Sequence, residues 1–125
     1  MTSVDPRLSL RLLDAEQEAL CRRIATLTPA EREAPSNLAG WSVNDLAVHI
    51  TRVCDSILRA IERALENDRT PAFGPAARPR EDEIRAMAPK DWAELQRSHY
   101  ARIRTIIESC TESALDDYCF PHPQG

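Results

Sequence analysis

Few side chains in this sequence could bind a metal ion or act as nucleophiles. Each can therefore be assessed from its position relative to the neighbouring residues. The chain contains three histidines and four cysteines. A catalytic zinc site needs three protein ligands and one open position for water or substrate. The candidates are the histidines His49, His99 and His122 and the cysteines Cys21, Cys54, Cys110 and Cys119.

His49 lies on a predicted helix that begins after Ser42 and has a stripe of apolar residues. It comes three residues after Leu46 and four before Val53, at the edge of that stripe. By spacing alone, this position is more typical of a half-buried histidine that hydrogen-bonds to a neighbour than of a metal ligand.

His99 lies on the apolar face of the last predicted helix, between Leu95 and Ile103. In a helical bundle it could face His49 across the interior and provide a second nitrogen ligand. Its apolar neighbours favour the other interpretation, a core histidine whose ring nitrogens are satisfied by hydrogen bonds.

The cysteines give weaker signals. Cys54 follows His49 by five residues, about 140° further round the helix, so the pair cannot chelate a metal from one face. We interpret Cys21 and Cys54 as small core residues. Near the C-terminus there is one loose Cys-x8-Cys-x2-His cluster, which lacks the two tight ligand pairs of a structural zinc site. It consists of Cys110, Cys119 and His122.

Helices must position all of these side chains, because apolar residues recur at helical spacing in three segments. Thr28 with Glu31, and Ser42 with Asp45, have the spacing of capping boxes that begin helices. We predict long helices over residues 6–27, 43–67 and 91–110, with loops over 28–41, 68–80 and 111–125.

These elements predict a single domain over residues 1–125 with an all-α fold, an up-down antiparallel helical bundle. A short helix is expected around 81–87, and Asp91 with Glu94 is expected to cap the last long helix. Trp41 precedes the cap of the second long helix, so we expect it to be buried against Leu46 as a hydrophobic staple.

Composition excludes several classes of protein. The net charge of −4 gives no basic field for nucleic acid or an anionic membrane surface. The longest uncharged stretch is far shorter than a membrane-spanning helix requires. The four cysteines lack the dense spacing of a secreted disulfide scaffold, so we expect a cytoplasmic protein with reduced thiols.

Residues 38–50, with the sequence Leu-Ala-Gly-Trp-Ser-Val-Asn-Asp-Leu-Ala-Val-His-Ile, carry a family resemblance. The segment is similar to a signature of the mycothiol-dependent maleylpyruvate isomerases and their DinB-like relatives. In these families a Gly-Trp-(Ser/Thr)-Val turn leads into an Asp-Leu pair and then a histidine. The Thr-Pro-Ala-Glu turn at 28–31 and the connection at 115–125 are also similar to the family pattern.

The resemblance implies a four-helix bundle that holds a divalent metal, usually zinc, through three side chains. His49 corresponds to the first ligand, and the motif around it favours a metal-site position over the hydrogen-bonded histidine that spacing alone suggested. The family's other two ligands lie on a fourth helix, which we do not find in this sequence. His99 and His122 are the candidates for replacing them.

Two functional hypotheses follow. In the first, the metal activates water or a low-molecular-weight thiol such as mycothiol for attack on a small-molecule substrate. In the second, the chain is a non-catalytic association module with an incomplete metal site. With only three long helices, a strip of apolar residues beside the second and third long helices has no fourth helix to cover it. We therefore expect a homodimer in either case. A second chain's His99 or His122 could then supply a ligand near His49.

Overall fold

The structure is a computed structural model and describes residues 6–110. In this range the chain is helical and contains no β-strand, so the predicted all-α fold is confirmed. None of the described helices is both long and apolar enough to cross a membrane. The elements in chain order are α1 (Pro6–Ala25), α2 (Pro29–Glu33), α3 (Val43–Leu65), the 3₁₀ helix η1 (Gly74–Ala77), α4 (Arg78–Arg85) and α5 (Pro89–Ser109).

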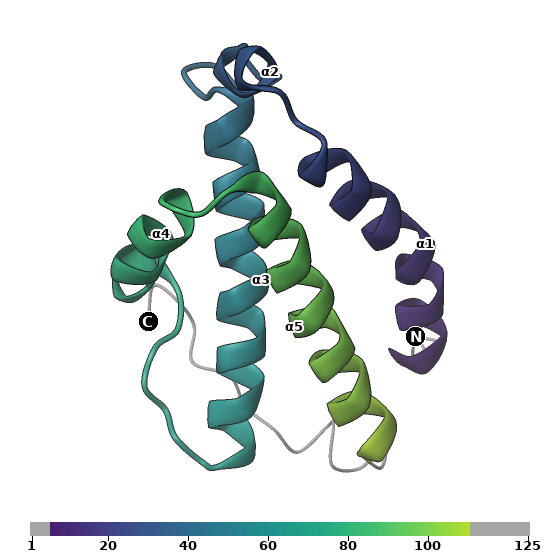
Figure 1. Cartoon of the computed structure of the whole chain (residues 1–125). Coiled ribbons are helices and arrows are strands. Elements are labelled where there is room, and N and C mark those ends of the chain that lie inside the picture. The colour runs from purple at the N-terminus through teal and green to yellow at the C-terminus, as the bar shows by residue number, and fades with distance from the viewer. Residues whose placement is uncertain (1–5, 111–125) are drawn as a thin grey trace.

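The helix α5 is the centre of the arrangement. It packs against α1 on one side and against α3 on the other, and α4 packs on α3 (Figure 1). The main core cluster lies near the start of α3 and α5, around the fully buried Trp92 and Ile84. A second cluster lies towards their ends, around Leu58, Ile103 and Ile106.

The direction of one helix pair differs from simple up-down order. Residues of α1 and α5 pair in opposite order, Asp14 with Arg104 and then Glu18 with Arg97, so these two helices are antiparallel. Residues of α3 and α5 pair in the same order, first Thr51 with Gln96 and then Asp55 with His99, so these two helices run in parallel (Figure 1). The connection over 66–88 leads from the C-terminal end of α3 back to its N-terminal end, where α5 begins. The sequence predicted a loop over 68–80 but not its direction.

Local start signals explain where the helices begin. Both predicted capping boxes are present: Thr28 with Glu31 begins α2, and Ser42 with Asp45 begins α3. The predicted cap at Asp91 is wrong, because α5 begins two residues earlier at Pro89 and its N-cap makes no side-chain hydrogen bond. A proline at the first helical position has no N–H to satisfy and already holds a helical φ, so it replaces the expected cap.

The predicted apolar stripe of α3 is only half-buried. The residues that fill the fully buried face of this helix are mostly small or polar, among them Ala47, Thr51, Cys54 and Asp55. The large apolar residues of the stripe keep part of their surface exposed. They are Leu46, Ile50, Val53, Ile57, Ile61 and Leu65. The last three of them also pack against the core cluster around Leu58.

Candidate functional site

The loop before α3 holds Trp41 in one place. Gly40 has a φ of +82°, in the left-handed region that glycine adopts without strain, and this turns the chain back on itself. The amide of Ser36 donates to the carbonyl of Trp41 at 2.9 Å, and the amide of Val43 donates to Ala34 at 2.8 Å. These bonds fix the loop against the start of α3.

In this loop Trp41 lies over His49. The two ring centroids are 5.0 Å apart and the planes are nearly perpendicular, at 81°. Trp41 remains 37% exposed, so the expectation that it is buried is wrong. The loop hydrogen bonds place the indole against the histidine ring.

A cavity of about 160 Å³ opens beside His49. On one side Arg85 of α4 donates to Asp45 at 2.8 Å, while the same carboxylate also caps α3 through Ser42. The Ser42 amide, followed by Arg85, lowers the pKa of Asp45 below its ordinary value. The cavity is lined by Gly40, Trp41, Asp45, His49, Glu81 and Arg85.

A guanidinium occupies the other side of the His49 ring. Nη2 of Arg52 lies 3.4 Å from Nδ1 of His49, and Nε of Arg52 lies 3.6 Å from a carboxylate oxygen of Glu81. Because a guanidinium only donates, Nδ1 must accept, and the ring proton of neutral His49 is then on Nε2. A metal bound through Nε2 would place a proton on Nδ1, so Arg52 would have to turn away.

The described residues do not form a complete metal site. Within 6–110, no three His, Cys, Asp or Glu side chains lie close enough together to hold a metal ion. His49 and His99 each line a cavity, of about 160 and 380 Å³ respectively, but the Nε2 atom of His99 is hydrogen-bonded to Asp55. Cys110 is half-buried at the end of α5, while Cys119 and His122 lie outside the described residues. Zinc therefore does not fit residues 6–110 without ligands from elsewhere.

The cysteines of the core are unsuited to thiolate chemistry. Cys21 and Cys54 are 0% and 2% exposed, which confirms their interpretation as core residues. Burial raises the pKa of Cys54 to about 12, so its thiol stays protonated at neutral pH. A thiol would need to lose its proton to bind a metal or attack a substrate.

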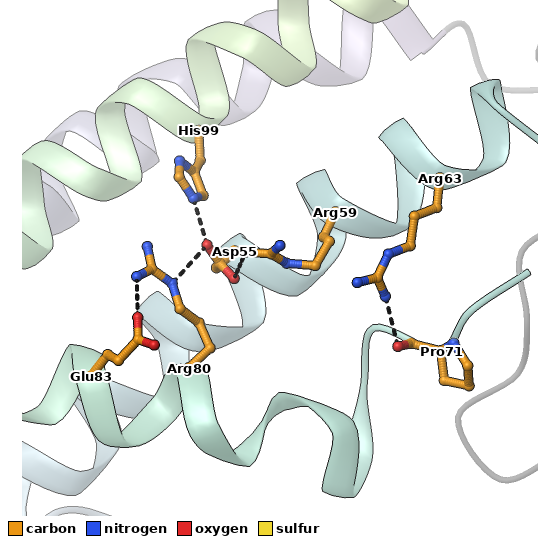
Figure 2. A network of polar contacts seen from close by, with 7 residues as sticks. All are labelled: Asp55, Arg59, Arg63, Pro71, Arg80, Glu83 and His99. Carbon is orange, nitrogen blue, oxygen red and sulfur yellow. Dashed lines mark hydrogen bonds and ion pairs between the residues drawn. The ribbon is translucent and has the colours of Figure 1, made fainter. Parts of the chain in front are cut away.

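A second polar cluster lies further along α3, around a buried carboxylate. His99 of α5 is 2.8 Å from Oδ1 of Asp55, Nε of Arg80 in α4 is 3.2 Å from the same atom, and Nη2 of Arg59 is 3.4 Å from Oδ2 (Figure 2). Burial acts to raise the pKa of Asp55, but the His99 hydrogen bond and the charges of Arg80 and Arg59 outweigh it and lower the pKa to about 2.

Sequence reasoning missed this cluster. The available signal was an aspartate within the apolar run Val53-Cys54-Asp55-Ser56-Ile57, because a carboxylate on the buried face of a helix requires cationic partners. The partners could not be read from spacing, since they come from two other helices.

Comparison with known proteins gives two positive findings. A sequence model of the family described as the mycothiol maleylpyruvate isomerase N-terminal domain matches residues 13–117. The fold is similar to a solved structure described as the mycothiol-dependent maleylpyruvate isomerase, with a TM-score of 0.65 and 23% identity. That match covers 91% of this chain and 50% of the other, so this chain spans half the length of that enzyme. No curated protein sequence matches.

Proposed function

This chain belongs to the family of mycothiol maleylpyruvate isomerase N-terminal domains, and from this we propose that it is the metal-binding domain of a thiol-dependent isomerase or transferase. His49 is proposed as the first ligand. The remaining ligands would come from outside residues 6–110, with His122 as the candidate in this chain. We propose a small-molecule electrophile as the substrate, and a reducing, cytoplasmic setting in which a free thiol persists.

One observation carries this proposal: the His49 ring lines a cavity beside the ion-paired side chains of Asp45, Glu81 and Arg85. The contacts that the structure gives to the ring are the edge of Trp41 and Nη2 of Arg52. The ring makes no bond to a carboxylate of the described residues, unlike the ring of His99. The ring nitrogens of His49 are therefore more accessible to a ligand than those of His99.

The residues around His49 have separate tasks in this proposal. Trp41 contacts the His49 ring at nearly a right angle and would fix its orientation. The Asp45–Arg85 pair fixes α4 against the start of α3 and so sets the width of the cavity. Arg52 contacts His49 through Nη2 and Glu81 through Nε at the same time, so on metal binding it would give up the first contact and keep the second. A bound metal would supply the positive charge that favours the deprotonated thiol.

Cobalt substitution tests the thiol part of the proposal. The whole chain is loaded with Co²⁺ and titrated with a small thiol, and absorption is recorded in the region of sulfur-to-cobalt charge transfer. We expect a new band in the wild-type chain and none in His49→Ala. His99→Gln, which keeps a donor towards Asp55, is the matched control and should keep the band. A band of equal strength in His49→Ala would rule out the assignment of His49.

A second candidate function is association, which the half-buried stripe of α3 favours. Leu46, Ile50 and Val53 at the start of this stripe remain partly exposed, and an exposed apolar strip is commonly covered by a partner. The occupant that we propose is a second copy of this chain. Sedimentation equilibrium at micromolar concentration should show a dimer that Val53→Glu disrupts. Leu12→Glu, at a 69% exposed site on α1, is the control. A monomer at every concentration would reject this candidate.

A further inference from the structure

His49 lies between two ion pairs that join α3 to α4. A carboxylate oxygen of Asp45 is 2.8 Å from Nη1 of Arg85, and Nε of Arg52 is 3.6 Å from a carboxylate oxygen of Glu81. In the first pair α3 supplies the carboxylate, and in the second it supplies the guanidinium. Because Asp45 comes four residues before His49 and Arg52 three residues after it, all three lie on one face of α3. This order along the helix determines which charges lie beside the ring.

The group that contacts the His49 ring is the cation of the second pair. Nη2 of Arg52 is 3.4 Å from Nδ1 of His49. The side chain of Arg52 is 13% exposed, against 44% for Arg85 in the first pair. A charge that is largely removed from water is screened less, so it acts more strongly on its neighbours. Arg52 therefore places a weakly screened positive charge beside the ring that lines the cavity.

This arrangement is the opposite of what a metal-binding histidine requires. Such a histidine usually donates from its second ring nitrogen to a carboxylate or a carbonyl, and this bond orients the ring and increases its basicity. The group at Nδ1 of His49 is instead a guanidinium, which has only donors. The carboxylate of Glu81 lines the same cavity, but its ion pair is with Arg52. Both the charge and the hydrogen-bonding polarity at Nδ1 therefore oppose a metal ion at His49.

We propose that Arg52 opposes metal binding at His49 and that Glu81 counteracts Arg52, so that this ion pair regulates the affinity of the site. The inference rests on the proposed function, in which His49 is a ligand. Without the guanidinium, Nδ1 is free to carry the proton that a metal-bound ring requires. Without the carboxylate, the charge of Arg52 is no longer offset by this partner.

The two partners of this ion pair should therefore have opposite effects on metal affinity. A pair that only held α4 against α3 would behave differently, because either substitution would break it and both would act in the same direction. The sign of the two effects separates regulation of His49 from a purely structural role.

The test is zinc affinity of the whole 125-residue chain, measured by competition with a chromophoric chelator under reducing conditions. Arg52→Gln should raise the affinity at least about tenfold and Glu81→Gln should lower it about tenfold, as is usual for groups that contact metal ligands. Arg52→Lys keeps the positive charge and should stay close to the wild type. Arg102→Gln and Glu94→Gln, at exposed sites on α5, are the matched controls and should leave the affinity unchanged.

A second measurement needs no metal. Nitrogen chemical shifts of the imidazole rings are recorded by nuclear magnetic resonance on the metal-free chain, above the pH range in which histidine usually titrates. The signals of His49 are those that disappear in His49→Ala. We expect the ring proton on Nε2 in the wild type, because Nδ1 accepts from the guanidinium. In Arg52→Gln the fraction with the proton on Nδ1 should rise.

Three results would overturn the inference: no gain of zinc affinity in Arg52→Gln, a change in the same direction in Arg52→Gln and Glu81→Gln, or a wild-type His49 with its proton on Nδ1. Failure of the proposed function is seen separately, as a zinc affinity that His49→Ala does not change. Circular dichroism establishes that each variant is folded, and Arg52→Met provides a second neutral variant of the same position.

Discussion

Nε2 of His99 lies 2.8 Å from Oδ1 of Asp55. This bond joins the middle of α5 to the middle of α3, and the two helices run in parallel. The aspartate side chain is 5% exposed and the histidine side chain 14%. Arg80 brings α4 to the same carboxylate. One buried carboxylate therefore connects three helices, and its ionisation should control how firmly they pack.

The first prediction concerns acid sensitivity. Folding lowers the pKa of Asp55 from 3.8 to about 2. A depressed carboxyl pKa stabilises the fold above the unfolded value, so this contribution is complete above a pH of about 4 and is lost as the pH falls towards 2. Asp55→Asn should lower the free energy of unfolding at pH 7 by about 3 kcal/mol, because it leaves cations without their buried partner.

The test of this prediction is urea unfolding at several pH values. The stability difference between the wild type and Asp55→Asn should shrink by about 2 kcal/mol between pH 4 and pH 2. Asp82→Asn, on the exposed side of α4, serves as control and should change stability by less than about 0.5 kcal/mol. A difference that is independent of pH would show that the Asp55 charge does not hold the helices together.

The second prediction concerns the start of α3. Ser42 accepts from the amide of Asp45 at 3.0 Å, and Asp45 accepts from the amide of Ser42 at 3.0 Å. Ser42→Ala should cost about 1 kcal/mol, the usual loss for an N-cap. Ser98→Ala, on the exposed face of α5, should be neutral or slightly stabilising. Chemical denaturation measures both, and an equal effect of the two substitutions would contradict the cap.

The third prediction separates the two tryptophans. Trp92 is fully buried and donates from its indole to the carbonyl of Ile84, so Trp92→Ala should cost about 3–5 kcal/mol. Trp41 is partly exposed and rests on His49, so Trp41→Ala should cost only about 1 kcal/mol. Equal losses in thermal or urea unfolding would mean that Trp41 is as important to the core as Trp92 and would contradict this prediction.

Much of the fold follows from local sequence, because helix starts depend on neighbouring residues. Ser42 and Asp45 specify the beginning of α3 by direct hydrogen bonds, and the apolar period of the following residues requires a helix. The cap at Asp91 failed for an equally local reason, since Pro89 two residues earlier can begin a helix without a side-chain cap.

Other features depend on contacts between distant segments, and local patterns do not contain them. The parallel direction of α3 and α5 follows from the path of residues 66–88. The partners of Asp55 come from α4 and α5, so the aspartate signals a need for cations without naming them. For His49, the motif predicts a role in a site. The cavity beside His49 could not be predicted, because it depends on how the loop before α3 places Trp41.

The most direct test of the central proposal is zinc binding by the whole chain. Affinity is measured by competition with a chromophoric chelator, under reducing conditions, for the wild type, His49→Ala, His122→Ala and His99→Gln. We predict one zinc ion per chain, with affinity reduced at least about tenfold in His49→Ala and in His122→Ala and unchanged in His99→Gln. A chain that binds no zinc, or binds it equally well without His49, would contradict the proposal.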